Sequence, residues 1–268
     1  MNYHEWVASL RARADQPPVV ARLPLWWGDS IIGSVEPAFF DAVLPARAIG
    51  DDGWVQPVAR DGDEGWLVNG DLTRTLSQIA LAIKDAGAAH AWRSEQLAVA
   101  DAGGKTLGTV ERAVVRQLGI ATFAVHLAAT SADGRHWVQQ RSLTKPNDPG
   151  LWDTLMGGMV PACDTLQQAL ERETWEEAGL KLEQLGDLAY GGRLATRRPC
   201  ADGQAGYIVE QIDWYRCTIP EALVPSNQDG EVVQFVQMTK DELRQKLVRD
   251  EFTTEAALIL VAAGLTEG

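Results

Sequence analysis

Acidic residues that could bind a metal are concentrated in one short segment, Gly158–Leu180, which reads GMVPACDTLQQALERETWEEAGL. If this segment is helical, Glu173, Glu176 and Glu177 fall within an arc of roughly 100° on one face. Crowded carboxylate oxygens suit Mg²⁺ or Mn²⁺, which also share the oxygens of substrate phosphates. Such an ion would neutralise a diphosphate and lower the pKa of an attacking water. The spacing does not assign which glutamate binds the ion and which accepts a proton.

The ends of this helix can also be predicted. Asp164 is expected to be the N-cap, with Gln167 completing a capping box, and Gly179 is expected to end the helix in a left-handed conformation. The alternative to a metal site is a solvated acidic helix face. Repulsion between two glutamates about 6 Å apart is only roughly 0.7 kcal/mol in water, so energy alone does not exclude it. The fixed spacing of the glycines, the arginine and the glutamates favours the metal site.

This spacing resembles the Nudix box, G-x5-E-x7-R-E-U-x-E-E-x-G-U, in which U is a bulky aliphatic residue. The matching residues are Gly158, Arg172, Glu173, Glu176, Glu177, Gly179 and Leu180. Asp164 replaces the first glutamate and Thr174 the first aliphatic residue. Asp164 is one methylene shorter than glutamate, and Thr174 is a mild change.

The resemblance implies roles for the residues of the box. The three glutamates Glu173, Glu176 and Glu177 would bind the metal. Arg172 would orient Glu173, and the carbonyl of Gly157 would be a further ligand. It also implies an α/β/α Nudix sandwich with a mixed sheet, within the α+β class.

Flanking segments resemble the Nudix proteins related to thiamine pyrophosphokinase. They are Arg141–Val160 and Val224–Phe235, and also Trp92–Val99 and Glu111–Leu127, which match the region that precedes the Nudix domain in those proteins. This resemblance implies a small α+β N-terminal helper domain at 1–117 and a Nudix hydrolase domain at 118–268. It implies hydrolysis of a small organic diphosphate, such as thiamine diphosphate or its oxidised analogues, to a monophosphate and phosphate.

Other polar and aromatic residues can be interpreted either as functional residues or as ordinary structural or solvent-exposed ones. Glu231 would be a further metal ligand or the base, or else an ordinary turn acid. Arg193 follows two glycines in a basic loop, where it would grip a phosphate or stay solvated. Arg141 and Lys145 are candidates for phosphate contacts, and Trp152 for an aromatic clamp on a flat ring. His126, on an alternating strand, is expected to be a core residue.

Elements that would position these residues follow from periodicity and turn signals. In the first half we expect a helix near Tyr3–Ala14, strands and turns within Leu25–Val68, a helix capped by Asp71 and a short helix at Thr109–Gln117. In the second half, beside the acidic helix, we expect strands at Leu185–Arg193, Tyr207–Thr218 and Val232–Thr239 and helices near Lys240–Arg249 and Glu251–Ala263.

Composition narrows the class of function. A net charge of -13 argues against binding a nucleic-acid polymer or an anionic membrane. The three cysteines form no CxxC pair, and the first residues lack the apolar core of a secretory signal. We therefore expect a cytoplasmic protein whose partner is a small-molecule diphosphate, with a homodimer left open.

Two other functions remain open from the sequence. A protein that senses a phosphorylated ligand without cleaving it would have little need of three intact glutamates. An enzyme like isopentenyl-diphosphate isomerase would need a cysteine and a glutamate facing an allylic carbon, and no feature of the sequence requires that pair. Hydrolysis is therefore the favoured interpretation.

Overall fold

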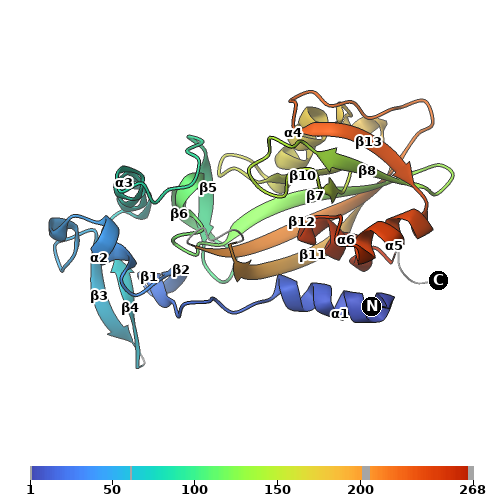
Figure 1. Ribbon diagram of the computed structural model, residues 1–268. Helices are drawn as coiled ribbons and strands as arrows, with labels where there is room; N and C mark the ends of the chain where they lie inside the picture. Colours follow the sequence, from blue (N-terminus) through green and yellow to red (C-terminus); the bar gives the residue numbers. More distant parts are fainter. Residues whose placement is uncertain (1, 61, 201–205, 265–268) are drawn as a thin grey trace.

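The computed structural model describes residues 2–60, 62–200 and 206–264. Its strands form two larger sheets, at opposite ends of the molecule in Figure 1, and a small hairpin between them. The first sheet has the order β2-β1-β4-β3 and belongs to the first half of the chain. Its strands are β1 (Leu23–Trp27), β2 (Ser30–Val35), β3 (Val55–Arg60) and β4 (Asp63–Val68). The short helix α2 (Phe39–Val43) and the 3-10 turn η1 (Ala46–Ala48) connect β2 to β3.

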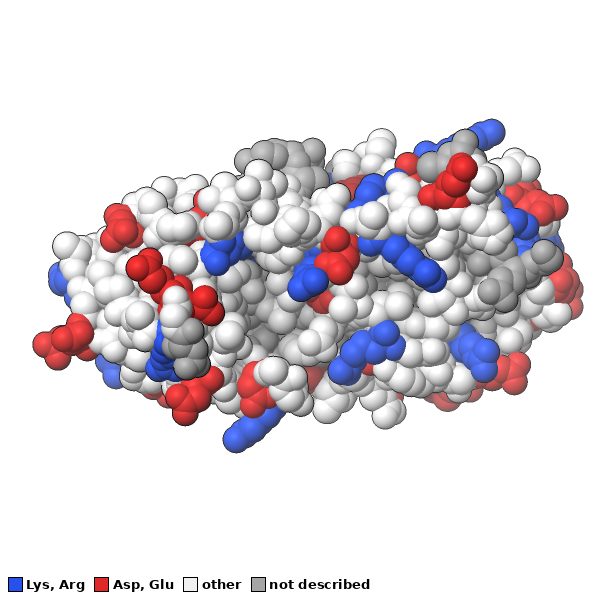
Figure 2. All heavy atoms as spheres, turned by 90° about the horizontal axis from the view of Figure 1, so that it is seen from below, with Lys and Arg blue, Asp and Glu red and all other residues white. Residues whose placement is uncertain are grey.

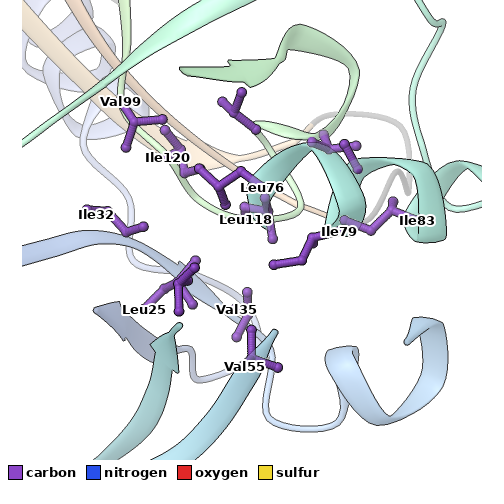
Figure 3. Packing of buried hydrophobic residues seen from close by; sticks show 14 of the residues in the cluster. Leu25, Ile32, Val35, Val55, Leu76, Ile79, Ile83, Val99, Leu118 and Ile120 are labelled. Carbon is purple, nitrogen blue, oxygen red and sulfur yellow. The ribbon is translucent and has the colours of Figure 1, made fainter. Parts of the chain in front are cut away.

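The helix α3 (Leu72–Asp85) supplies one side of the first core. It begins where predicted, because the Asp71 side chain accepts a hydrogen bond from the backbone N–H of Arg74. Leu76, Ile79 and Ile83 extend from α3 toward the strands of the first sheet (Figure 3). Their helical spacing therefore builds a continuous apolar face, as the sequence predicts.

The first core also holds the start of the second half. Leu118 and Ile120 lie in it, directly before the strand β7 (Figure 3). The hairpin of β5 (Gln96–Ala100) and β6 (Thr106–Glu111) continues into a 3-10 turn, η2 (Arg112–Val114), so the short helix predicted at Thr109–Gln117 is wrong. Leu97 forms an isolated bridge with Pro161. These contacts fix the first half against the loop that precedes the acidic helix.

The second sheet is mixed and has the order β11-β12-β7-β8-β13, with β10 beside β7 and β9 beside β8. Its strands are β7 (Thr122–Ser131), β8 (His136–Arg141), β9 (Trp152–Asp153), β10 (Met156–Met159), β11 (Gly186–Pro199), β12 (Tyr207–Ile219) and β13 (Val232–Met238). β12 runs parallel to β7, whereas the other pairs are antiparallel. This confirms the predicted mixed sheet.

Helices cover both faces of the second sheet (Figure 1). α4 (Leu166–Ala178) packs on the face that carries Leu127 and Ala129, and is followed by the 3-10 turn η3 (Leu182–Gln184). α5 (Lys240–Val248) and α6 (Thr254–Ala262) cover the other face. Alternate residues of β7 thus pack on opposite helix layers, which confirms the α/β/α sandwich within the α+β class.

The first helix, α1 (Tyr3–Ala14), packs far from the rest of the first half. Trp6 and Leu10 are buried among residues of α5 and α6. Figure 1 shows α1 beside these two helices, with residues 15–22 leading back to β1. The division at residue 117 stays a prediction, and α1 makes its contacts across that division.

Charge is mixed over the surface. On the face shown in Figure 2, Lys and Arg side chains are interspersed with Asp and Glu rather than gathered by sign. Among the residues that the structure describes, no helix combines the length and apolar character needed to cross a membrane.

Candidate metal and diphosphate site

The acidic helix α4 begins one residue later than predicted. Thr165 is the N-cap, because its side chain accepts from the backbone N–H of Gln168 and the Gln168 side chain accepts from the backbone N–H of Thr165. The predicted cap of Asp164 with Gln167 is therefore wrong. The end of the helix is confirmed, since Gly179 adopts a left-handed conformation with φ of 63°.

One guanidinium joins three carboxylates beside α4. Arg172 donates from Nε to Asp164 at 3.0 Å, and from Nη1 to Glu173 at 2.9 Å and to Glu176 at 3.0 Å. Asp164 thus holds the arginine rather than capping the helix. This network fixes the direction of the Glu173 and Glu176 side chains without a bound ion.

Glu173 lies directly on the backbone of β10. A Cβ atom at Gly158 would be 2.1 Å from the Cδ of Glu173, so only glycine leaves room for the carboxylate. Burial raises the pKa of Glu173 to about 7; the Arg172 charge opposes this shift, and the Glu177 charge adds to it. The protein thus holds the Glu173 carboxylate at a position where burial disfavours its charged form.

Glu177 is the most buried carboxylate of the site, with 1% of its surface exposed. One oxygen accepts from Gln139 Nε2 at 2.7 Å and from the backbone N–H of Gly157 at 3.1 Å. The other accepts from Lys145 Nζ at 3.3 Å, and the same ammonium donates to Glu231. Burial raises the pKa of Glu177, although Lys145 opposes the shift.

The oxygen donors of this site fit a divalent cation only after two side chains move. In the described ranges, no three His, Cys, Asp or Glu side chains lie close enough together to hold an ion as they stand. The Lys145 ammonium, however, already bridges Glu177 and Glu231, where it supplies positive charge between two carboxylates. Hard oxygen donors with a cation between them fit Mg²⁺ or Mn²⁺, provided that Lys145 moves away and Glu176 turns from Arg172.

These residues open onto a cavity of about 440 Å³. β10 borders it, α4 forms its outer end, and the start of β7 and β12 forms its inner end. Three arginines that precede residue 118 in the chain also line it, namely Arg93, Arg112 and Arg116. The cavity is therefore shared by both halves of the chain.

The structure brings most of the predicted site residues together. Those lining the cavity are Arg141, Lys145, Gly157, Arg172, Glu173, Glu176, Glu177 and Glu231. Two predicted substrate contacts do not line it. Arg193 pairs with Asp213 at 2.9 Å, and Trp152 is buried in the core between the second sheet and α5 and α6.

Other cavity residues were missed by the sequence interpretation. The inner end carries Asp148, Arg198, Glu210 and Glu255. His126 is buried and hydrogen-bonded to Thr154, as expected of a core residue, and it also lines the cavity. The available signal was a charged residue directly after an apolar run, as Glu210 is after Tyr207, Ile208 and Val209. That signal does not identify the partner, because Thr122 lies on a strand that is distant in the sequence.

Comparisons with known proteins agree with this geometry. The family model described as NUDIX domain matches residues 121–257, just over half of the chain. An uncharacterized protein from Saccharomyces cerevisiae is 27% identical over 186 residues, covering 63% of this chain and 54% of the relative. Nudix hydrolase 20, chloroplastic, from Arabidopsis thaliana is 29% identical over 177 residues, covering 62% of this chain and 44% of the relative. The chain thus spans about half the length of these curated relatives.

A solved structure shows the fold independently. The crystal structure of DR0079 from Deinococcus radiodurans superposes with a TM-score of 0.50 at 18% sequence identity. The match covers 63% of this chain and 99% of that chain. At this identity the likeness concerns the fold alone.

Proposed function

Because this chain belongs to the NUDIX domain family, we propose that it hydrolyses a small organic diphosphate to a monophosphate and phosphate. The observation that carries this proposal is a pair of carboxylates on the wall of a cavity, the buried Glu177 and the partly buried Glu173, each paired with a cation. Water supplies the oxygen of the new P–O bond, and the bridging P–O bond breaks. The protons of the water pass to the products or to solvent.

Glu173, Glu176, Glu177 and the carbonyl of Gly157 are the proposed ligands of Mg²⁺ or Mn²⁺. When bound, such an ion neutralises phosphate charge and lowers the pKa of a coordinated water. Arg172 positions two of the glutamates, since it donates to both. Asp164 acts through Arg172 by accepting from its Nε.

The cations near the outer end would bind the phosphates. Arg141 contacts Asp153 at 3.2 Å and lines the cavity, and Lys145 lies between Glu177 and Glu231. An arriving diphosphate offers Lys145 a new partner of the same sign as the carboxylates that it leaves. Glu231, released from Lys145, is the carboxylate proposed to accept a proton from water or to add a ligand to the ion.

The finer proposals concern the substrate and the first half of the chain. We propose thiamine diphosphate or its oxidised analogues as substrates, from the resemblance of the flanking segments. The N-terminal helper domain, residues 1–117, would complete the pocket through Arg93, Arg112 and Arg116, which line the cavity. The cytoplasmic location stays a prediction from the sequence, and a homodimer stays open.

A phosphate-release assay tests the proposal. The full chain with Mg²⁺ would be offered thiamine diphosphate, its oxidised forms, ADP-ribose and nucleoside diphosphates. We expect release from at least one of them, abolished by EDTA and restored by excess Mg²⁺. Binding without turnover of any diphosphate would favour a sensor. Interconversion of allylic diphosphates without free phosphate would favour an isomerase.

A further inference from the structure

A buried amide, that of Gln139, lies between the second sheet and the acidic helix. Gln139 belongs to β8, and 1% of its surface is exposed. Strand alternation places it on the same face of β8 as Trp137, which packs against the core formed with α4. Phe235, its partner on β13, packs against the same core. A polar side chain thus occupies an apolar layer of the sandwich, where it needs a hydrogen-bond partner.

One end of this amide has a partner and the other end has none. Nε2 of Gln139 donates to Oε2 of Glu177 at 2.7 Å. Among the residues that the structure describes, no group donates to Oε1 of Gln139, which is also buried. The amide cannot exchange its two ends, because an ionised carboxylate accepts hydrogen bonds and has none to donate. The unpaired oxygen is therefore a consequence of placing the amide nitrogen against Glu177.

Packing alone does not account for a glutamine at this position. A buried acceptor without a donor costs free energy, and an apolar side chain of similar size would avoid that cost. Methionine, for example, is unbranched and fills a similar volume, but it has no N–H group. The feature that only the amide supplies is its hydrogen bond to the Glu177 carboxylate.

The donors around Glu177 are divided between its two oxygens. Oε2 accepts from two neutral groups, Nε2 of Gln139 and the backbone N–H of Gly157. Oε1 accepts from the Lys145 ammonium. The neutral donors lie on β8 and β10, which belong to one sheet, whereas Lys145 lies in the connection between β8 and β9. The sheet therefore holds Oε2, and Oε1 is the oxygen that faces a cation.

We propose that Gln139 is a positioning residue for metal binding, which fixes Oε2 of Glu177 so that Oε1 faces the ion. Gln139 does not line the cavity, so it acts through Glu177 rather than on the substrate. Without its N–H, Oε2 would keep only the longer bond from Gly157, at 3.1 Å, and the carboxylate could rotate. This inference rests on the proposed function for the place of the ion, and it adds a residue that controls the affinity for that ion.

A Mn²⁺ titration of the full chain without substrate tests this role. Electron paramagnetic resonance of the free ion gives the Kd, and Gln139→Met removes the N–H while nearly preserving the volume of the side chain. We expect the Kd for Mn²⁺ to rise about tenfold, with a circular dichroism spectrum like that of the wild type. An unchanged Kd in the folded variant would overturn the inference. If Gln139→Met is unfolded, Gln139→Asn, whose amide is one methylene shorter, replaces it with the same expected result.

Gln117 provides the matched control. It is 4% exposed, its Nε2 donates to the carbonyl of Ala88 at 2.7 Å, and its Oε1 is likewise buried without a donor in the described part of the chain. Its partner is a backbone carbonyl rather than a carboxylate of the site. Gln117→Met should therefore leave the Kd for Mn²⁺ unchanged. A similar rise in both variants would show a general effect on the fold and would overturn the role of Gln139.

The Mg²⁺ requirement of hydrolysis gives a second measurement. Phosphate release by Gln139→Met should need about tenfold more Mg²⁺ for its half-maximal rate, and should approach the wild-type rate when Mg²⁺ is saturating. A purely structural defect would lower the maximal rate, because less protein is folded, without changing the Mg²⁺ requirement. That second pattern would count against a positioning role.

The positioning role and the proposed hydrolysis can fail separately. If no diphosphate is cleaved, yet the Kd for Mn²⁺ rises in Gln139→Met and not in Gln117→Met, hydrolysis fails and the role of Gln139 stands. If diphosphates are cleaved and neither the Kd nor the Mg²⁺ requirement changes in Gln139→Met, hydrolysis stands and the role of Gln139 fails. A wild-type chain that binds no Mn²⁺ would also overturn that role, whatever the hydrolysis assay shows.

Discussion

The two ends of the cavity differ in how their glutamates are paired. At the outer end, Glu173 accepts from Arg172, and Glu177 accepts from three donors, one of them the Lys145 ammonium. At the inner end, Glu255 accepts from Arg198, whereas among the described residues Glu210 accepts from the neutral hydroxyl of Thr122. The outer end thus pairs both of its buried glutamates with protein cations, while the inner end pairs Glu255 with a cation and Glu210 with a hydroxyl. We therefore place the proposed chemistry at the outer end and expect a change at Glu210 to act on binding or stability instead.

Both ends carry a glutamate whose pKa is raised to about 7, and burial is the main cause in each. The charged groups beside each glutamate decide whether its ionised form is also stabilised. Beside Glu173, Arg172 favours the charged form and a second cation lies near Glu177. Beside Glu210, the next largest influence is another carboxylate, Glu255. A change at the outer end should therefore reduce turnover, whereas one at the inner end should alter binding and stability.

Glu177→Gln should have the largest effect on turnover. The amide keeps the size of the side chain but removes the charge from the most buried carboxylate of the outer end. We expect Mg²⁺-dependent phosphate release to fall about 1000-fold while the far-ultraviolet circular dichroism spectrum is retained. Glu171→Gln, at an exposed position on the same helix, should have wild-type activity. Wild-type turnover in Glu177→Gln would break the assignment of chemistry to this end.

Gly158→Ala should have the next largest effect, because it displaces a carboxylate without removing one. The new Cβ would lie 2.1 Å from Cδ of Glu173, so the side chain must move away from β10. A displacement of this size costs about 100-fold in turnover. Steady-state kinetics with Mg²⁺ would measure it. Gly186→Ala is the control, since its nearest neighbour atom would be 3.6 Å away. Equal activity of the two variants would show that the position of Glu173 is unimportant.

Asp164→Asn should have a smaller effect, because Asp164 acts through Arg172. The amide still accepts from Arg172 Nε but no longer neutralises its charge, so the hold on Glu173 and Glu176 is weakened. We expect about a tenfold loss of activity. Asp164→Glu keeps the charge and restores the residue of the Nudix box, so it should retain wild-type activity. A loss in Asp164→Glu as large as in Asp164→Asn would mean that length, not charge, governs this contact.

The outer end could be predicted from the sequence because its parts are local. Helical spacing alone places Glu173, Glu176 and Glu177 on one face, and the structure keeps them on α4. The one local error was the cap, where Thr165 competes with the adjacent Asp164. Both residues are good N-caps, and the reciprocal bond from Gln168 decides between them.

The inner end could not be predicted, because its contacts join distant segments. Glu210 meets Thr122 only because β12 runs parallel to β7, 88 residues apart in the chain. The same limit applies to α1, whose helical pattern predicts its bounds but not its packing against α5 and α6. The predicted loop around Arg193 is instead part of the long strand β11. Local sequence patterns thus predicted most helices and strands, whereas the pairing and register of the strands decided which distant residues come into contact.

Glu210→Gln should give the smallest effect of the four, a change in stability that depends on pH. In the folded wild type the pKa of Glu210 is about 7, above the ordinary value of 4.5, so the folded state binds this proton more tightly than the unfolded state. Stability therefore falls as pH rises from about 4.5 to about 7, and stays lower above that range. The amide carries no charge and avoids this loss.

We expect Tm of the metal-free, ligand-free Glu210→Gln variant to exceed that of the wild type by a few degrees at pH 8 and to match it at pH 4, below the ordinary pKa. Differential scanning calorimetry at the two pH values measures the difference, with Glu183→Gln, at an exposed position in η3, as the variant that should change neither. A lower Tm for Glu210→Gln at pH 8 would show that a protein cation already stabilises this carboxylate, with Arg116 the first candidate because its charge lowers the pKa of Glu210. The inner end would then resemble the outer one, and the contrast between the two ends would be lost.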